Sequence, residues 1–332
     1  MIDKYNRNID YLRISITDRC NLRCKYCMPD GVEFKSMRDI LTFEEIIRIT
    51  KIFVSLGIDK IKITGGEPLV RKDAIKLIKD IKNVDDIKEV TLTTNGILLN
   101  EYINELEDIN LDAINISLDT LNPKLYEIIT GQDKLDVVLN NLKLALKTKI
   151  KIKLNVVSID LNELKRKYNL KIDDDEIFKL IDLAKDNDLD IRFIEVMPIG
   201  YGKNFKTIDH DELLNKLKER YKNIKVDNEK HGNGPARYYK IDGFKASIGF
   251  ISAIHNKFCD SCNRIRLTSF GYLKPCLCFN EGLDLKKMIR SDMSDNDIKK
   301  EITRVIYNKP KAHTFDDLTS VSEDKNMNDI GG

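Results

Sequence analysis

The sequence lacks the long apolar segments that membrane proteins need. Spanning a bilayer takes about 20 consecutive apolar residues, and no run approaches that length. The N-terminal residues 1–17 contain no apolar signal core. An excess of either charge is also missing, because 56 Lys and Arg face 54 Asp and Glu. A general nucleic-acid-binding surface is therefore not indicated, and we expect a soluble cytoplasmic protein without a membrane or nucleic-acid partner.

Cysteine is scarce and unevenly distributed. All seven cysteines fall into two tight groups, which are Cys20, Cys24 and Cys27, and then Cys259, Cys262, Cys276 and Cys278. In the reducing cytoplasm cysteines seldom form disulfides, and thiols that only fill a core would be scattered along the chain. The clustering favours sites built from thiolates.

Short β-rich runs alternate with helical patterns over much of the chain. Strands are predicted at residues 11–17, 60–64, 89–94, 113–119, 150–159 and 190–196. Helices are predicted at residues 42–57, 71–83, 100–109, 123–130, 135–147 and 173–187. Strands that alternate with helices in this way indicate a parallel α/β fold. No dinucleotide-binding glycine pattern follows the first strand, which favours an incomplete (β/α)6 TIM-like barrel over a Rossmann sheet.

Polar side chains recur on one face of several predicted strands. Arg13 alternates with apolar neighbours in the first strand, and Ser117 and Lys153 do the same in two later strands. If helices cover the apolar face, the polar face looks into the barrel. Barrel interiors are normally filled with branched apolar side chains, so repeated inward polar groups suggest a lumen that holds a ligand. This alternation does not orient Met197, which lies beyond the sixth strand.

The first cysteine group directly follows the first strand, at the end where barrel enzymes keep their chemistry. Its spacing, CxxxCxxC, supplies three thiolates, whereas thiolate metal sites normally have four ligands. A structural zinc site would need a fourth Cys or His, and no His is near in the sequence. A four-iron cluster held by three thiolates instead keeps one iron open for a substrate or cofactor.

The cysteine motif, with Tyr26 before its third cysteine, resembles the signature of the radical S-adenosylmethionine enzymes. The segment TGGEP at residues 64–68 is similar to the glycine-rich element of that family, where glycine lets the backbone approach the methionine amino group closely. The resemblance implies that the open iron of a 4Fe-4S cluster binds the methionine part of S-adenosylmethionine. An electron from the cluster would then split the sulfonium to give a 5′-deoxyadenosyl radical.

The second half of the chain narrows the resemblance. Residues 234–241, residues 257–277 and the C-terminal IGG are similar to the GTP 3′,8-cyclases, which catalyse the first step of molybdenum cofactor biosynthesis. The resemblance implies a second 4Fe-4S cluster whose open iron contacts guanine. We expect a radical S-adenosylmethionine partial barrel at residues 1–225. Residues 226–332 would form a C-terminal region with the second cluster, a GTP-binding segment and the Gly-Gly tail.

The resemblance also implies roles for individual residues. The ligands of the first cluster would be Cys20, Cys24 and Cys27, and those of the second would be Cys259, Cys262 and Cys276. S-adenosylmethionine would contact Tyr26, Gly66, Ser117 and Met197. GTP would contact Arg13, Lys62, Thr93, Lys153, Arg192, Arg264 and Arg266. A triphosphate needs several cations in a shielded cavity. The tail residues Gly331 and Gly332 would enter the active site.

The implied reaction removes the hydrogen at C3′ of the GTP ribose, after which the ribose radical attacks C8 of guanine. We expect an external one-electron reductant, transfer of the product to cyclic pyranopterin monophosphate synthase, and a homodimer. Two other classes stay open. A peptide-modifying radical enzyme with an auxiliary cluster is one, although NRIRLT and the terminal Gly-Gly argue against it. A ferredoxin-like electron carrier is the other, but it would want four ligands on each cluster and no large α/β domain.

Several features depart from the family pattern, namely the connection at residues 158–175, Phe270, Cys278 and Lys325. Cys278 is a surplus thiol close to Cys276, and the family spacing from Cys262 selects Cys276 as the third ligand. Chemistry alone does not show which of the two thiols is the third ligand, because alternation in a strand would point both thiols to the same face. We expect Cys278 to be a packed or reactive free thiol. The connection at residues 158–175 is longer than usual.

Overall fold

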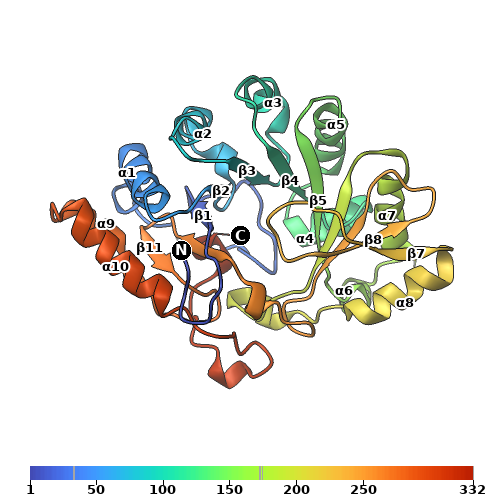
Figure 1. The fold of residues 1–332 in the computed structure, drawn as a ribbon. Helices are drawn as coiled ribbons and strands as arrows, with labels where there is room; N and C mark the ends of the chain where they lie inside the picture. Colours follow the sequence, from blue (N-terminus) through green and yellow to red (C-terminus); the bar gives the residue numbers. More distant parts are fainter. Residues whose placement is uncertain (33, 172, 174, 332) are drawn as a thin grey trace.

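Within the described residues, which are 1–32, 34–171, 173 and 175–331, the computed structural model has one curved sheet with helices on its outer side (Figure 1). The strands are β1 (Tyr11–Ser15), β2 (Lys60–Thr64), β3 (Glu89–Thr94), β4 (Ala113–Ser117), β5 (Lys151–Val157), β6 (Asp190–Ile194), β7 (Ile224–Asp227), β8 (Arg237–Ile241), β9 (Ile248–Ile251), β10 (Arg264–Leu267), β11 (Tyr272–Lys274) and β12 (Leu283–Asp284). The helices are α1 (Phe43–Val54), α2 (Ala74–Lys82), α3 (Leu99–Asp108), α4 (Pro123–Thr130), α5 (Leu135–Ala145), α6 (Leu161–Tyr168), α7 (Glu176–Asp186), α8 (His210–Arg220), α9 (Leu285–Arg290), α10 (Asp295–Tyr307) and α11 (Met327–Ile330).

The middle of the sheet is parallel. β1 to β6 are neighbours in chain order, and β10 and β9 continue the parallel pairing beyond β1 and β6. Antiparallel strands extend both edges and end at β12 and β7. In the part of the chain that the structure describes, these two edge strands do not pair with each other, so the barrel stays open. This arrangement confirms the predicted α/β fold with an incomplete barrel.

The two regions predicted from the sequence share this sheet. The boundary after residue 225 falls within β7, and β6 pairs with β9 across it. β1 likewise pairs with β10. Strands from both regions therefore line one concave face, and the division into two domains stays a prediction.

Local sequence features set the ends and the buried face of α1. The predicted capping box is present, because Thr42 and Glu45 each accept a hydrogen bond from the other's backbone N–H. After the helix, Gly57 has a φ of +88°, which glycine adopts without strain. Ile46 and Ile49 are fully buried in the main apolar core, which also contains the apolar strand residues. The apolar strand faces thus look outward to the helices, and the polar faces look inward.

All six predicted strands and all six predicted helices are present; β2, β3 and α4 have the predicted ends, and the ends of the others are shifted. The connection at residues 158–175 contains a further helix, α6, that the sequence reasoning missed. Asp160 caps its start, and Asn169 ends it in the left-handed conformation. Leu164 of α6 belongs to an apolar cluster against which Tyr26 packs. The long connection therefore covers the neighbourhood of the first cysteine group.

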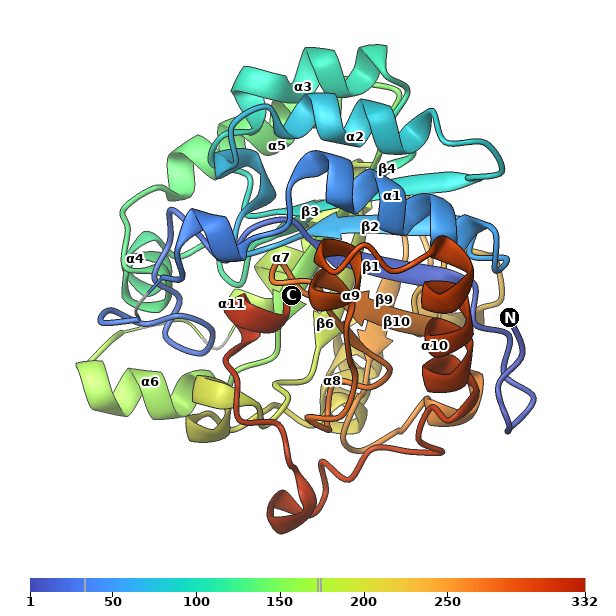
Figure 2. The same ribbon diagram turned by 90° about the vertical axis from the view of Figure 1, so that its left-hand side faces the viewer.

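The C-terminal segment returns to the interior of the curve. α10 lies on the outer side of the sheet, and residues 308–326 then lead to α11, whose end lies inside the curve (Figure 1, Figure 2). Ile330 of α11 is buried. The last described residues are therefore part of the lumen rather than of the outer surface.

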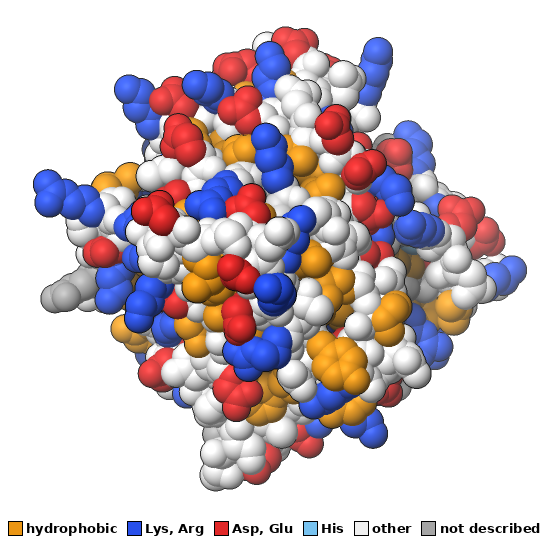
Figure 3. All heavy atoms as spheres, turned by 60° about the vertical axis from the view of Figure 1, so that its left-hand side comes forward, with side chains coloured by type: hydrophobic (Ala, Val, Ile, Leu, Met, Phe, Trp, Pro, Cys, Tyr) orange, Lys and Arg blue, Asp and Glu red, His pale blue; other side chains and the backbone are white. Residues whose placement is uncertain are grey.

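The outer surface has a mixed character. Acidic and basic side chains are interspersed on the face shown in Figure 3, in line with the balance of charges in the sequence. Among the described helices, none combines the length and the apolar character that crossing a bilayer requires. Several basic side chains are instead buried inside the barrel.

Candidate active site

Basic side chains line the concave face of the sheet. The strand register places Arg266 of β10, Arg13 of β1 and Lys62 of β2 side by side. Across the lumen, Lys153 of β5 and Arg192 of β6 are buried. Five strands thus direct cations toward one space, as the inward orientation predicted for Arg13 and Lys153 requires.

These cations repel one another. Burial, and then the neighbouring cations with Arg192 first, hold the pKa of Lys62 well below its usual value. Burial and then Arg192 lower the pKa of Lys153 to about 7. Burial and then Arg13 lower the pKa of Arg266 to about 9. A bound polyanion would relieve this repulsion, since an opposite charge favours the ionised form of each group.

Several buried polar atoms of this face have no hydrogen-bond partner among the described residues. They are Nε of Arg192, Arg264 and Arg266, Oγ1 of Thr93 and Oδ1 of Asn155. A buried polar atom without a partner costs free energy, and native proteins pair nearly all of them. Free guanidinium donors on three arginines fit a ligand rich in acceptor oxygens, such as a triphosphate.

The first cysteine group lies in the loop after β1, at the carboxyl end of the parallel strands. Gly66 donates its N–H to the carbonyl oxygen of Thr17 at 2.7 Å, and Glu67 donates to that of Arg19 at 2.8 Å. A Cβ at position 66 would lie 2.4 Å from the carbonyl oxygen of Arg19. Glycine is therefore needed for the packing of TGGEP on the cysteine loop. Contact between Gly66 and S-adenosylmethionine stays a prediction.

The three thiols of this loop are half-buried. Burial and then Glu67 raise the pKa of Cys20 to about 11. Burial and then Cys20 raise the pKa of Cys27 to about 12. Burial and then Cys27 raise the pKa of Cys24. A metal would offset this penalty, since thiols that bind a metal are deprotonated.

Neither cysteine group has the close spacing of a zinc site. Thiolates on one zinc ion lie about 3.8 Å apart, because each of the tetrahedral Zn–S bonds is about 2.3 Å long. Among the described residues, three ligand atoms lie within 4.8 Å of one another in the group of Asp227, Glu229 and His231. In neither described cysteine group do three sulfur atoms lie this close together. The wider spacing of the sulfur atoms fits a metal cluster better than a single ion.

The residues predicted to contact S-adenosylmethionine lie around the same loop. Tyr26 donates a hydrogen bond to Asp119 at 2.8 Å, which ties the cysteine loop to the segment after β4. Ser117 is the last residue of β4. Met197 packs against an apolar cluster that contains Ile330 of the tail. The carboxyl ends of β1, β4 and β6 therefore bring Tyr26, Ser117 and Met197 to one end of the lumen.

The second cysteine group lies at the other end. Cys259 and Cys262 precede β10, which is parallel to β1, and the β10–β11 hairpin brings Cys276 back to the same end. Burial raises the pKa of Cys259, and Cys276 adds to the effect. Burial also acts to raise the pKa of Cys262, but Lys309 and Arg264 outweigh it and the pKa is lowered. The basic lumen thus lies between the two cysteine groups.

Cys278 is buried, whereas Cys276 is half-buried and packs against the same apolar cluster. The Cys278 side chain is 0% exposed in this cluster with Phe315. Its sulfur atom lies 3.5 Å from Oγ1 of Thr314 and accepts a hydrogen bond from the Thr314 N–H at 3.4 Å. Strand alternation does not apply to these two thiols, because β11 ends at Lys274 and neither cysteine lies in a strand. Cys278 is a packed thiol in this structure.

The tail reaches β1. A Cβ at Gly331 would lie 2.6 Å from Cβ of Ser15, and the φ of Gly331 is +91°. Burial raises the pKa of Asp329, and Asp18 of the cysteine loop adds to the effect. Gly331 thus lies in the lumen, while Gly332 lies outside the described residues. The catalytic role of the tail stays a prediction.

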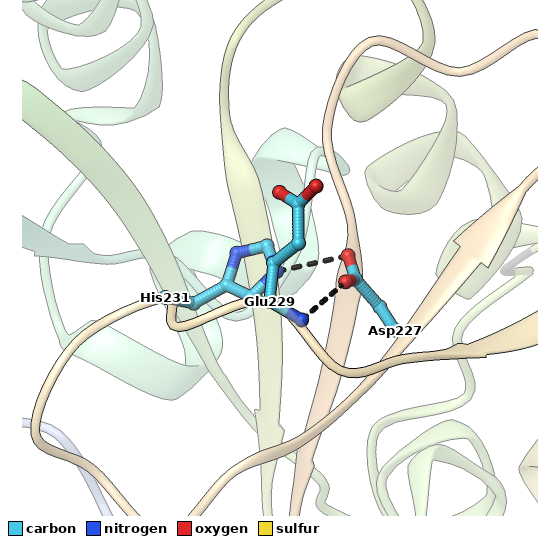
Figure 4. A group of neighbouring side chains, drawn as sticks. All are labelled: Asp227, Glu229 and His231. Carbon is cyan, nitrogen blue, oxygen red and sulfur yellow. Dashed lines mark hydrogen bonds and ion pairs between the residues drawn. The ribbon is translucent and has the colours of Figure 1, made fainter.

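His231, which was not predicted as a site residue, links two carboxylates beside the lumen. Nδ1 of His231 lies 2.8 Å from Asp190, and Nε2 lies 2.9 Å from Asp227. Figure 4 shows the ring beside Asp227 and Glu229. Asp190 in turn lies 3.7 Å from Nζ of Lys153. His231 therefore holds the carboxylate that faces a predicted GTP ligand.

Two glycines lie close to basic residues of this part of the lumen. A Cβ at Gly232 would lie 3.1 Å from Nζ of Lys153, and a Cβ at Gly234 would lie 4.0 Å from Nη1 of Arg192. The resemblance had selected residues 234–241, which begin at one of these glycines. The sequence does not show which basic residues they approach, because those residues belong to distant strands.

Comparisons with known proteins identify the families to which the two parts of the chain are similar. The Radical SAM superfamily matches residues 14–161, and Molybdenum Cofactor Synthesis C matches residues 189–315. The GTP 3′,8-cyclase of Clostridium perfringens (strain 13 / Type A) is 44% identical over 335 residues, and that of Alkaliphilus oremlandii (strain OhILAs) is 43% identical over 340 residues. Each alignment covers 100% of both chains.

A solved structure supports the fold. Streptococcus suis SuiB bound to S-adenosylmethionine superposes with a TM-score of 0.63 at 16% identity, over 96% of this chain and 76% of that chain. At this identity the likeness concerns the fold alone. The alignments to the curated relatives extend over the whole chain, so they span both cysteine groups and the strands between them. The chain belongs to the GTP 3′,8-cyclase family, and its first half belongs to the radical S-adenosylmethionine superfamily.

Proposed function

We propose that the protein is a GTP 3′,8-cyclase, which converts GTP to (8S)-3′,8-cyclo-7,8-dihydroguanosine 5′-triphosphate in the first step of molybdenum cofactor biosynthesis. The observation that carries this proposal is the set of buried, mutually repelling cations between two cysteine groups. A triphosphate supplies the matching negative charge, and the two ends of the lumen suit chemistry on the ribose and recognition of the base.

The cations bind the phosphates in this proposal. They are Arg13, Lys62, Lys153, Arg192, Arg264 and Arg266, with Thr93 as a further donor. An arginine can give two aligned donors to phosphate oxygens, whereas a lysine acts as a point charge. Because these groups sit on adjacent strands of a rigid sheet, they fix the nucleotide before any chemistry begins.

The first cysteine group holds a 4Fe-4S cluster in this proposal, and Tyr26, Gly66, Ser117 and Met197 contact S-adenosylmethionine. When bound there, the cofactor supplies a 5′-deoxyadenosyl radical that removes the hydrogen at C3′ of the ribose. Such a radical attacks almost any nearby C–H bond, so the protein must hold the ribose within about 3 to 3.5 Å of the attacking atom and keep water out. Ile330 and Gly331 of the tail, packed into the lumen, support that exclusion.

The second cysteine group, Cys259, Cys262 and Cys276, would hold a second 4Fe-4S cluster, which would bind guanine. The protein takes its electron from an external one-electron reductant and acts in the cytoplasm as a homodimer. Its product passes to cyclic pyranopterin monophosphate synthase. The alternative, a peptide-modifying radical enzyme, finds less support, because a peptide would not need the buried cations of the lumen.

The decisive experiment is anaerobic reconstitution followed by incubation with S-adenosylmethionine, dithionite and GTP. We expect 5′-deoxyadenosine and a cyclised nucleotide with the mass of GTP in the mass spectrum. Reconstituted protein should also bind about eight irons, and replacing Cys20, Cys24 and Cys27 by Ala should halve that content. Zinc in place of iron, or cofactor cleavage with no cyclised nucleotide, would overturn the proposal.

A further inference from the structure

A buried lysine joins the two segments that carry Cys262 and Cys276. Lys309 follows α10 and is only 2% exposed. Its Nζ donates one hydrogen bond to the carbonyl oxygen of Arg264 at 3.1 Å and another to that of Pro275. Arg264 comes two residues after Cys262, and Pro275 directly precedes Cys276. One ammonium group therefore sets the distance between the two segments.

An arginine and a backbone amide fasten Cys259 to the same region. Nη1 of Arg7 donates to the carbonyl oxygen of Cys259 at 3.0 Å and to that of Lys311 at 2.9 Å, and Nη2 donates to that of Pro310 at 2.7 Å. The N–H of His313 donates to the sulfur atom of Cys259 at 3.5 Å. Residues 309–313 thus contact all three cysteine-bearing segments.

The charge of Lys309 needs a partner that its hydrogen bonds do not provide. Both acceptors are neutral carbonyls, and within the described residues no carboxylate forms an ion pair with Lys309. A buried ammonium group is costly unless negative charge lies nearby. Cys259 and Cys262 are thiols that its field reaches. Three thiolates around an iron cluster would supply the missing negative charge.

A helix C-cap does not account for this position. Lysines near a helix C-terminus often bind the last free carbonyls of their own helix. α10 ends at Tyr307, but Nζ of Lys309 bonds carbonyls that lie outside α10. The side chain therefore serves the cysteine-bearing segments rather than the helix that precedes it.

We propose that Lys309 is a positioning residue of the second cluster. It aligns the segments of Cys262 and Cys276 and supplies the positive charge that makes this cluster easier to reduce. Groups just outside the ligands tune metal centres in this way. The inference rests on the proposed function, since it requires a cluster at the second cysteine group.

Removing the charge should change the reduction equilibrium of one cluster only. In Lys309→Met, we expect the second cluster to bind iron but to be at least tenfold harder to reduce, which is about 59 mV for a one-electron couple. Lys309→Arg keeps the charge and should stay within threefold of the unchanged chain. Lys311→Met is the matched control, because its side chain is exposed on the same segment. The measurement is a redox titration followed by electron paramagnetic resonance, with the first cluster as the internal reference.

The outcomes separate this inference from the proposed function. If the unchanged chain binds about four irons instead of eight, the proposed function fails. If it binds eight, Lys309→Met should keep them and shift only the potential of the second cluster, while Lys309→Arg should keep both the iron and the potential. Equal loss in both variants would assign the effect to packing of the lysine stem and overturn the inference. A second-cluster potential in Lys309→Met that matches the unchanged chain, or loss of all iron, would overturn it as well.

Discussion

Gly331 packs against Ser15 of β1 so closely that a Cβ at position 331 would lie 2.6 Å from the Ser15 Cβ. Gly331 also has a φ of +91°, where any other residue is strained. We predict that Gly331→Ala lowers cyclisation at least 100-fold, because the tail would be displaced from the lumen. Iron content and folding should stay normal, since the change lies at the end of the chain. Product formation by mass spectrometry and iron analysis test this.

A second glycine provides the control for backbone strain. Gly243, in the turn between β8 and β9, has a φ of +80°, and a Cβ there would meet nothing within 4 Å. Gly243→Ala should therefore keep cyclisation activity while introducing similar strain. Full activity in Gly331→Ala, or after deletion of both terminal glycines, would show that the tail is only a chain end.

Arg266 should affect GTP binding and leave radical generation intact. Its guanidinium is buried beside Arg13, and its Nε has no partner among the described residues. Losing a charge-assisted contact costs about 1.5 to 3 kcal/mol, so Arg266→Ala should weaken GTP binding about 10- to 100-fold. Cleavage of S-adenosylmethionine without GTP should proceed at the original rate. Calorimetry and a 5′-deoxyadenosine assay measure the two quantities.

Arg304 provides the matched surface arginine. It pairs with Glu301 at 2.8 Å on α10, and both side chains are largely exposed. Arg304→Ala should change neither GTP binding nor cofactor cleavage. If Arg266→Ala abolishes both reactions while both clusters remain, Arg266 has a structural role and the assignment fails.

The sequence carries most of the information on the first half of the site, because that information is local. Alternation within β1 and β5 orients Arg13 and Lys153, and CxxxCxxC is a short motif. Alternation also has a clear limit. Met197 lies beyond β6, so only the packing of the folded chain shows that it faces the tail.

The supports of the second site could not be predicted, because they join residues that are far apart in the chain. Arg7 contacts the carbonyl oxygen of Cys259 across 252 positions. Lys309 and His231 look like ordinary surface residues in the sequence, and burial alone distinguishes them. Strand prediction missed β7 to β12, and five of these six strands have four residues or fewer, whereas each strand that was predicted has at least five. Short strands leave little periodicity to detect.

Cys276 and Cys278 should respond differently to substitution. Cys276 is coupled electrostatically to Cys259, whereas Cys278 is packed against Thr314. We predict that Cys276→Ala loses about half of the iron and all cyclisation. Cys278→Ala should keep both clusters and most activity, with a stability loss of about 1 to 2 kcal/mol from the small cavity. Iron analysis and thermal unfolding of the two variants test this, and loss of iron only in Cys278→Ala would reverse the assignment.

Lys153 should make GTP affinity depend on pH. Burial and then Arg192 lower its pKa to about 7, and Asp190 opposes them only in part. Above pH 7 the lysine is therefore mostly neutral before GTP binds. A bound triphosphate favours the ammonium form and raises the pKa. Binding then takes up a proton, so affinity should fall as pH rises from 7 to 8.5, by at most about tenfold per pH unit.

Lys153→Arg isolates this effect, because a guanidinium stays charged throughout that range. The GTP affinity of Lys153→Arg should change with pH only where the nucleotide itself ionises. A phosphate loses its last proton near pH 6, so this contribution is small above pH 7. Calorimetry at pH 8 in buffers of different ionisation enthalpy counts the protons directly. We expect up to about one proton taken up by the unchanged chain and close to none by Lys153→Arg. Equal proton uptake in both proteins would mean that another group titrates, and Lys153 would then be charged before GTP arrives.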